Sequence, residues 1–257
     1  MGVDSGLRWT CAARTDVGLV RSRNEDAYLA QPERGLWAVA DGMGGHAFGD
    51  VASRAVVDAL ASLPPGGTVA DAIEEARQRL HGVNEDLRAQ ARARQVPVIG
   101  STVAALLVRG MEAACLWAGD SRIYLYRQAR LQQLTRDHSQ LEALKARGAD
   151  MAASMASPNM ITRAVGAAEA IDVDAVTLTV RDGDMFLLCS DGLSNPVEEP
   201  ALMTALAPGD CARAADELVA LALASGGRDN ITVIVVRVDD MSSDKTIVNP
   251  AIINPSL

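Results

Sequence analysis

The sequence predicts an α+β fold, in which antiparallel sheets pack face to face and pairs of helices cover them on the outside. Its periodic segments run in the order strands, two helices, a run of strands, two helices and a last strand. This order does not repeat a β-α-β unit, so a parallel sheet is not expected. Turns such as "RG" and "QAR" are so short that the strands they join must pair antiparallel. Close to half of the 257 residues are apolar, which is enough for a sizeable core.

Each element is predicted from the spacing of its apolar residues. Alternating segments with polar breaks predict strands at 7–15, 26–32, 35–42, 101–108, 112–121, 122–127, 131–135, 171–180, 185–192 and 230–238. Spacings of three and four predict helices at 49–63, from Val69 to Leu87, at 198–207 and at 211–225. The "PPGG" at 64–67 ends the first helix.

Two connections have less regular patterns. The turn "RDGD" at 181–184 joins two strands that are in register for a hairpin. The region 139–168 contains one short helix candidate, 140–148, followed by Met-, Ala- and Ser-rich sequence, and we interpret it as a surface flap.

Composition excludes several classes of protein. A formal charge of −9 and a pI near 4.8 argue against a nucleic-acid-binding protein. No segment has the pattern of a signal peptide or a membrane span. The four cysteines are scattered without a CxxC pair, which is typical of reduced, mostly buried thiols in a cytoplasmic protein.

Carboxylates stand at the edge of an apolar strand five times, at Glu25–Asp26, Asp41, Asp120, Asp191 and Asp229. A single Asp-Gly pair is usually just a turn, and Asp137 in "TRDHS" could simply cap the next helix. Repetition changes this interpretation, because carboxylates gathered at one end of a sheet repel one another unless cations join them.

Oxygen ligands of this kind favour Mg²⁺ or Mn²⁺ over zinc. The three histidines, His46, His81 and His138, are too few and too far apart for a His-based metal cluster. No Ser-His-Asp arrangement, cysteine nucleophile or GxxxxGK[ST] loop is legible. Any chemistry should therefore use metal-activated water.

Eight segments carry a resemblance to a known family. They are, in order, "RSRNED", "ADGMGGH", "GST", "WAGDSRIYLYR", "LTRDHS", "ITRAVG", "LLCSDGLSN" and "GGRDNITVIVV". Together they resemble the type 2C metal-dependent Ser/Thr protein phosphatases, the PPM family, in its compact bacterial branch. The resemblance implies a central antiparallel β-sandwich flanked by pairs of helices, four α-β-β-α layers in all, with metals at one edge. We expect a phosphatase domain at 1–240 and a flexible tail at 241–257.

The resemblance also implies a set of metal ligands. Asp41 matches the residue that bridges two metal ions, and Gly42 matches the one that gives its carbonyl to the second ion. Asp191 and Asp229 match further ligands of the first ion. Glu25 and Asp26 match the pair that holds the second ion, largely through water.

Bacterial members bind a third, weaker ion, for which Asp120 is the matching ligand and Asp137 a lower-ranked one. Arg21, four residues before Glu25, matches the arginine that binds the substrate phosphate, and Arg23 is its nearest rival. A guanidinium suits this role because it forms paired hydrogen bonds with a phosphate.

The implied reaction is Mg²⁺- or Mn²⁺-dependent hydrolysis of phosphoserine and phosphothreonine on proteins by metal-activated water. The metals and Arg21 would offset the charge on the equatorial oxygens. Eukaryotic members carry a histidine directly after the first Asp-Gly, whereas this chain has Met43. His46, three residues on, and a metal-bound water are equal candidates for the proton donor.

Two other functions stay open. The chain could be a pseudophosphatase that only binds phosphoproteins, or a regulatory relative that acts on anti-sigma-factor antagonists. Manganese-dependent turnover of a phosphothreonine peptide distinguishes an active phosphatase from a pseudophosphatase. The chain has no room for a sensor domain, which favours a stand-alone, monomeric phosphatase.

The resemblance implies that the partners are phosphorylated proteins and an opposing Hanks-type Ser/Thr kinase. The segment "ADGMGGHAFGDVASR" resembles phosphatases paired with kinases of secretion systems. In the tail, two Asn-Pro pairs disfavour regular structure. Thr246 in "DKTIV" is a candidate regulatory phosphosite for a forkhead-associated domain, and "TIV" or "AII" is a candidate docking strand.

Overall fold

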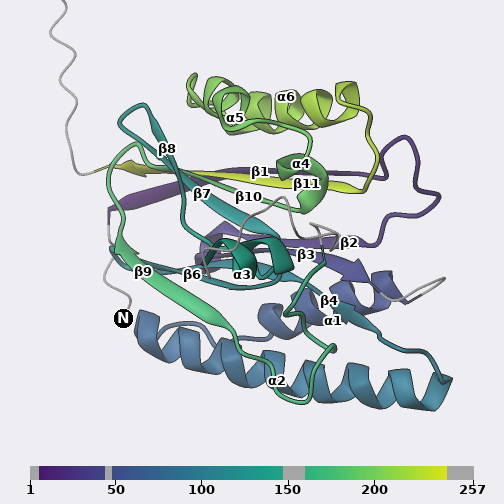
Figure 1. Cartoon of the computed structure of the whole chain (residues 1–257). Helices are drawn as coiled ribbons and strands as arrows, with labels where there is room; N and C mark the ends of the chain where they lie inside the picture. Colours follow the sequence, from purple (N-terminus) through teal and green to yellow (C-terminus); the bar gives the residue numbers. More distant parts are fainter. Residues whose placement is uncertain (1–5, 44–47, 147–159, 242–257) are drawn as a thin grey trace, which may run out of the picture.

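A computed structural model describes residues 6–43, 48–146 and 160–241 of the chain. Two antiparallel sheets lie face to face at the centre of the molecule, and helices cover the outer face of each (Figure 1). The result is the four-layer α-β-β-α sandwich that the sequence predicts.

The first sheet contains the two ends of the described chain. Its strands, in spatial order, are β1 (Leu7–Asp16), β11 (Ile231–Asp240), β10 (Met185–Cys189), β7 (Arg122–Arg127) and β8 (Arg130–Gln133). The register of β1 with β11 is continuous, from Leu7 opposite Asp240 to Asp16 opposite Ile231.

The second sheet is formed mainly by the first half of the chain. Its strands, in spatial order, are β2 (Asp26–Gln31), β3 (Leu36–Met43), β5 (Val103–Arg109), β6 (Glu112–Ala118) and β9 (Asp174–Thr179), and the two-residue strand β4 (Gly100–Ser101) pairs with the end of β3.

The predicted helix pairs are confirmed. The first pair, α1 (Gly49–Ala61) and α2 (Val69–Arg94), packs on the second sheet. The second pair, α5 (Glu199–Leu206) and α6 (Cys211–Ala224), packs on the first sheet. Three short elements complete the description: η1 (Pro32–Arg34), α3 (Gln140–Ala146) and α4 (Asp191–Ser194).

Helix α2 shows how the local sequence sets an element's bounds. The Thr68 hydroxyl accepts a hydrogen bond from the Asp71 amide, and the Asp71 carboxylate accepts one from the Thr68 amide. This reciprocal cap fixes the start of the helix. Its end is marked by Gln95, which adopts a left-handed conformation with φ of 57°.

Small and branched residues fill most of the core, as the scarcity of aromatic residues requires. Between the sheets, Trp37 and Phe186 are fully buried among Val, Ile, Leu and Ala side chains. Separate apolar clusters lie under α1 and α2 and under α5 and α6. Of the four free cysteines, Cys115, Cys189 and Cys211 are buried. Within the described ranges, no helix is both long and apolar enough to cross a membrane.

The prediction of a hairpin at 181–184 is wrong. Strand β9 pairs with β6 in the second sheet, whereas β10 pairs with β7 and β11 in the first, so the turn carries the chain from one sheet to the other. Arg127 of β7 holds both sides of this crossing, because it donates hydrogen bonds to the buried carboxylate of Asp184 and to the Thr179 carbonyl of β9. The connection between β6 and β7 also crosses between the sheets, while the pairs β5–β6 and β7–β8 are antiparallel as predicted.

The less regular region is described only in part. The predicted short helix is present as α3, and residues 160–168 bridge to the second sheet and to Ser139 through Ser101–Val165 and Ser139–Ile161 contacts. Asp137 does not cap α3; the Ser139 hydroxyl accepts the hydrogen bond from the Glu142 amide instead. The remainder of the predicted flap, 147–159, lies outside the described residues.

Candidate metal and phosphate site

The predicted acidic residues come together at one end of the sandwich, where strands of both sheets begin or end. Asp26 opens β2 and lies directly opposite Asp41 near the end of β3. Asp191 follows β10, and Asp229 precedes β11, which pairs with β10. Since β2 and β3 belong to one sheet and β10 and β11 to the other, the carboxylates face one another across the sandwich end.

Three of these carboxylates carry a buried oxygen without a hydrogen-bond partner in the described structure: Asp26 Oδ1, Asp120 Oδ1 and Asp191 Oδ1. Asp120, which follows β6, is only 7% exposed. A buried carboxylate oxygen without a partner is costly, so native proteins rarely leave one without a role. Three at one place indicate a missing positive charge.

The electrostatics support the same interpretation. Burial, together with the charges of Asp191 and Asp229, raises the pKa of Asp26 to about 7, although hydrogen bonds with Thr232 and Ser190 oppose the shift. Burial and the Asp191 charge likewise raise the pKa of Asp120 to about 7. Burial, followed by the charges of Asp26, Asp191, Asp120 and Asp229, holds the pKa of Asp41 well above its usual range. These groups repel one another when ionised, and a cation would relieve the repulsion.

Neutral polar residues hold the backbone and the carboxylates of the cluster in place, and sequence reasoning did not assign them a role. Thr102 Oγ1 accepts a hydrogen bond from the Asp41 amide at 2.9 Å, and Ser190 Oγ donates to Asp26 Oδ2 at 2.8 Å. Both residues are completely buried. The only sequence signal for them is that each lies within a quoted motif, "GST" or "LLCSDG".

Two asparagines have similar positioning contacts. Asn230 Oδ1 accepts a hydrogen bond from the Glu25 amide at 2.8 Å, while its Nδ2 donates to the carbonyls of Val17 and Arg23. Asn195 Nδ2 donates to Asp191 Oδ2 at 3.1 Å. Asn230 therefore ties the loop before β2 to the start of β11.

Glycine is required where β3 meets α1. A Cβ on Gly42 would lie 2.0 Å from the Gly49 carbonyl oxygen and 2.6 Å from that of Glu25. A Cβ on Gly49 would lie 2.7 Å from Cδ of Glu25. The absence of side chains at both positions lets the start of α1 approach the backbone beside Glu25 and Asp41.

Arg21 is the one predicted cation of the site, and it faces the carboxylates. Its Nη2 lies 2.8 Å from Asp229 Oδ2, and its side chain is 55% exposed. Hydrogen bonding to Asp229 and the charges of Asp229, Asp41 and Glu25 raise its pKa. Arg23 contributes its backbone carbonyl to Asn230, and among the described residues only Arg21 has a guanidinium contact with a carboxylate of the cluster.

The remaining predicted residues have different positions. The Asp137 carboxylate accepts hydrogen bonds from Arg122 at 2.7 to 3.1 Å, so it already has a counter-ion, although its charge still raises the pKa of Asp120. Met43 ends β3 and pairs with Gly100 of β4. His46 and Thr246 lie outside the described residues.

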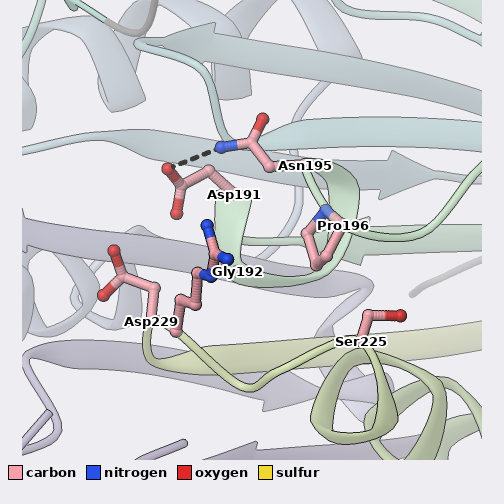
Figure 2. Close-up of a pocket in the computed structure, with 7 residues that line it drawn as sticks. Asp191, Gly192, Asn195, Pro196, Ser225 and Asp229 are labelled. Atoms are coloured by element: carbon pink, nitrogen blue, oxygen red, sulfur yellow. Dashed lines mark hydrogen bonds between the residues drawn. The ribbon is translucent and has the colours of Figure 1, made fainter. Parts of the chain in front are cut away.

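A cleft of about 480 Å³ opens beside the carboxylates. Asp191, Gly192 and Asp229 line one part of it, and Asn195, Pro196, Ser225 and Arg228 complete its wall. Figure 2 shows Asn195 hydrogen-bonded to Asp191, with Asp229 at the same mouth of the cleft. The cleft gives a polar ligand access to the carboxylates from solvent.

The residues fit a site for hard cations that is completed by water. Among the residues that the structure describes, no three His, Cys, Asp or Glu side chains meet around one point as in a site built from side chains alone. The partnerless carboxylate oxygens and the close backbone at Gly42 instead suit ions that keep part of their water shell. Mg²⁺ and Mn²⁺ bind carboxylate, carbonyl and water oxygens in this way.

Known proteins are similar to this chain in sequence and in structure. The sequence profile of the family described as Protein phosphatase 2C matches residues 20–224. The serine/threonine protein phosphatase PstP of Mycobacterium tuberculosis is 39% identical over 245 residues, which are 91% of this chain and 46% of PstP. The chain thus spans about half the length of that relative.

Solved structures are similar along almost the whole chain. PppA, described as a key regulatory component of T6SS in Pseudomonas aeruginosa, has a TM-score of 0.84 and 43% identity over 90% of this chain and 97% of its own. The catalytic domain of PstP in complex with two manganese ions has a TM-score of 0.82 and 37% identity over 91% of this chain and 100% of its own. These similarities confirm the predicted fold and the family resemblance.

Proposed function

Because the chain belongs to the protein phosphatase 2C family, we propose that it hydrolyses phosphoserine and phosphothreonine in proteins with Mn²⁺ or Mg²⁺ bound at the carboxylate cluster. The observation that carries the proposal is the set of partnerless buried oxygens on Asp26, Asp120 and Asp191. The two manganese ions of the PstP catalytic domain support the choice of metal.

In this proposal each carboxylate has a distinct place. Asp41 would be a ligand of both core ions, and the Gly42 carbonyl would be a ligand of one of them. Asp191 and Asp229 would hold the first ion, while Glu25 and Asp26 would hold the second, largely through water. Thr102, Ser190, Asn195 and Asn230 keep these groups oriented through the hydrogen bonds described above.

A third, weaker ion is part of the proposal, with Asp120 and Asp191 as its ligands. Asp137 is the poorer candidate, because Arg122 already neutralises it with a two-pronged contact. Breaking a buried pair of this kind is costly. A metal at Asp120 would therefore be held by few protein ligands, consistent with weak binding.

The bound metals would supply a water that loses its proton near neutral pH and would offset the charge of the phosphoryl group. The protein's own contribution is to orient and to bind. Arg21 is exposed enough to exchange its contact with Asp229 for a contact with the substrate phosphate. The cleft beside Asp191 and Asp229 admits the polypeptide that carries the phosphate.

The proton donor for the leaving alkoxide is not Met43, since a thioether has no proton to give. His46 and a water of the site are the two candidates. Substitution of His46 by alanine decides between them: an unchanged pH profile of kcat assigns the role to water, and a shifted profile assigns it to His46.

The proposed phosphatase domain comprises 1–240, with 241–257 as a tail that turnover of small phosphoesters does not need. The physiological partners in the proposal are phosphorylated proteins and an opposing Hanks-type kinase. Thr246 is the proposed phosphosite for a forkhead-associated domain. The cytoplasmic location and the monomeric state stay predictions from the sequence.

The decisive experiment follows phosphate release from a phosphothreonine peptide. Protein freed of metal with EDTA should be inactive, and Mn²⁺ should restore turnover. Asp191→Asn should abolish it, whereas Asp216→Asn, a change at a 63% exposed carboxylate that pairs with Arg14 and is not part of the cluster, should leave it unaltered. Tight binding of the peptide without release at saturating Mn²⁺ would instead identify a pseudophosphatase.

A further inference from the structure

The end of the sandwich opposite the carboxylates holds a second cleft, of about 630 Å³. It lies where β1 begins, where β2 runs into η1, and where β5 turns into β6. Gly35 of this cleft and Asp41 of the carboxylate cluster lie near opposite ends of β3. Six residues of strand put them roughly 20 Å apart, so the second cleft is separate from the catalytic centre.

Three arginines from three different segments line this cleft: Arg8 of β1, Arg34 of η1 and Arg109 at the end of β5. We call it the arginine cleft. A single acidic side chain, that of the exposed Glu33, lines it as well. In a chain with a formal charge of −9, a concave site with this excess of cations is unexpected.

Hydrogen bonds to backbone oxygens hold two of these arginines in place. Arg34 donates to Gln31 Oε1 and to the carbonyls of Ala61 and Leu63. Arg109 Nε donates to the Gly66 carbonyl at 2.9 Å, and its Nη1 donates to those of Arg34 and Val108. Each guanidinium is thereby fixed, which lowers the entropy that it would lose on binding a ligand.

Neither fixed guanidinium has a counter-ion among the residues that the structure describes. Among the described residues, no carboxylate forms an ion pair with Arg34 or Arg109, and the structure gives Arg109 Nη2 no hydrogen-bond partner. Burial and the charge of Arg34 both lower the pKa of Arg109, so the two cations repel each other.

The third arginine is paired only loosely. Arg8 is 61% exposed and lies 3.6 Å from Asp239, whose carboxylate also accepts a hydrogen bond from Arg237 at 2.9 Å. Arg8 can therefore turn toward a ligand at little cost.

We propose that the arginine cleft is a second binding site for a phosphorylated segment of polypeptide, distinct from the catalytic centre. A phosphoryl group carries nearly two negative charges and three acceptor oxygens, and arginine side chains recognise it through paired hydrogen bonds. Apolar surface from Trp9, Pro32 and Val108 lines the same cleft and suits the side chains that flank the phosphorylated residue.

The chain's own tail starts at this cleft. Leu7, which lines it, lies opposite Asp240 in the sheet, and the Met241 amide donates a hydrogen bond to the Gly6 carbonyl. Five extended residues span roughly 17 Å, so Thr246, the predicted phosphosite, is within reach. The phosphorylated segment can therefore come from this tail or from another phosphoprotein.

The test uses the full chain loaded with Mn²⁺ and two peptides with a non-hydrolysable phosphonate in place of phosphothreonine. One peptide is 240–251 with the phosphonate at position 246, and the other is unrelated in sequence. Calorimetry should find about two peptides bound per wild-type chain, one in each site. The variant Arg8→Glu should bind about one, or bind the second at least tenfold more weakly.

Arg130→Glu is the matched control, because it makes the same change of charge at an exposed arginine of β8, outside the cleft. It should keep both sites. Both variants should hydrolyse p-nitrophenyl phosphate at the wild-type rate, since Arg8 lies outside the catalytic centre. If the proposed catalytic function failed, the number of bound peptides would fall from about one to none in Arg8→Glu instead.

The peptides distinguish the sources of the ligand. Tighter binding of the 240–251 peptide assigns the cleft to the chain's own tail, and equal binding assigns it to phosphoproteins in general. The proposal is overturned if Arg8→Glu binds like Arg130→Glu, or if the unphosphorylated peptides bind the cleft equally well. It is also overturned if inorganic phosphate alone binds as tightly as the peptides, because the polypeptide would then contribute nothing.

Discussion

The buried aspartates at the two ends of strand β10 differ in whether their carboxylate oxygens have hydrogen-bond partners. Just before the strand, Asp184 is 1% exposed and fully satisfied: Arg127 donates two hydrogen bonds to it, at 2.7 and 2.6 Å, and the Arg181 amide donates a third. Just after the strand, Asp191 keeps a buried oxygen that has no partner among the described residues, and so do Asp26 and Asp120 beside it.

The difference teaches that burial alone does not mark a functional carboxylate. Both aspartates belong to segments that contain Asp-Gly, "RDGD" and "CSDG", and both lie next to the same strand. What separates them is the arginine: Arg127 supplies the positive charge for Asp184, whereas in the proposed function a bound metal ion supplies it for Asp191.

The largest effect on this comparison is expected when a charge is removed from the carboxylate cluster at the Asp191 end of β10. Asp41→Asn should lower kcat at least a thousandfold, about 4 kcal/mol in the barrier, because it deletes the proposed bridge between the metals. The fold should be retained, since the change also removes a repulsive charge. Phosphate release and thermal unfolding of the same preparation measure both effects, and activity within tenfold of wild type would count against the site.

A change at the Asp184 end of β10, where the carboxylate has its counter-ion, should have the opposite effect: stability is lost and activity is kept. Asp184→Asn should lower the free energy of unfolding by about 3 kcal/mol, because it leaves Arg127 without its counter-ion, while kcat stays within about twofold. Denaturant unfolding measures the loss. Asp216→Asn, which removes an exposed pair with Arg14, should cost less than about 1 kcal/mol. Equal losses in the two variants would show that the buried pair has no special role.

Arg21 sharpens the comparison, because it is a cation with one contact in the carboxylate cluster. Arg21→Ala should raise KM for a phosphothreonine peptide about tenfold, or 1.4 kcal/mol, with a smaller change in kcat. Its single, exposed contact with Asp229 contributes little stability. Steady-state kinetics decide the point: a fall in kcat with KM unchanged would assign Arg21 to the transition state alone.

The smallest expected effect is on the pH dependence of stability without metal. The folded protein holds protons on Asp26 and Asp120 with pKa values of about 7, well above the ordinary value near 4. Their contribution to stability is therefore complete below that ordinary value and is lost as the pH rises through 7. In EDTA, Tm should fall by about 3 °C or more between pH 5.5 and 8.

Two measurements control this prediction. Mn²⁺ at pH 8 should raise Tm again, because it binds the ionised carboxylates of the folded state only. The Asp26→Asn variant should show a shallower dependence on pH in EDTA. A wild-type Tm that rises steadily from pH 5.5 to 8 in EDTA would contradict the assignment of these carboxylates.

Much of the fold could be predicted, because the spacing of apolar residues shows which face of a helix or strand is buried. The helices α1, α2, α5 and α6 and most of the strands follow from the spacing of apolar residues. The pairing of the strands could not be predicted in full. A turn such as "RDGD" has the same local chemistry within a hairpin and between two sheets, so it does not predict that β9 pairs with β6 while β10 pairs with β7 and β11.

The residues of the site were likewise predicted only in part. Acidic residues at strand ends are conspicuous in the sequence, and the structure does bring Asp26, Asp41, Asp191 and Asp229 to one end of the sandwich. Their neutral supports were not predicted, because a buried Thr102 or Ser190 has no periodic or charge signature. Such residues are recognised only once a hydrogen-bond partner from another strand is known.

The pairing of β1 with β11 has a consequence for synthesis on the ribosome. Strand β1 lies at the edge of its sheet, and β11 is the neighbour that separates it from β10. At a translation rate of 5–20 residues per second, roughly 10–40 s pass between the synthesis of β1 and that of β11. Until then β1 has no strand that joins it to β10 and the rest of its sheet. Its alternating apolar segment can therefore pair with other nascent chains. The domain thus becomes a single cooperative unit only with its last strand.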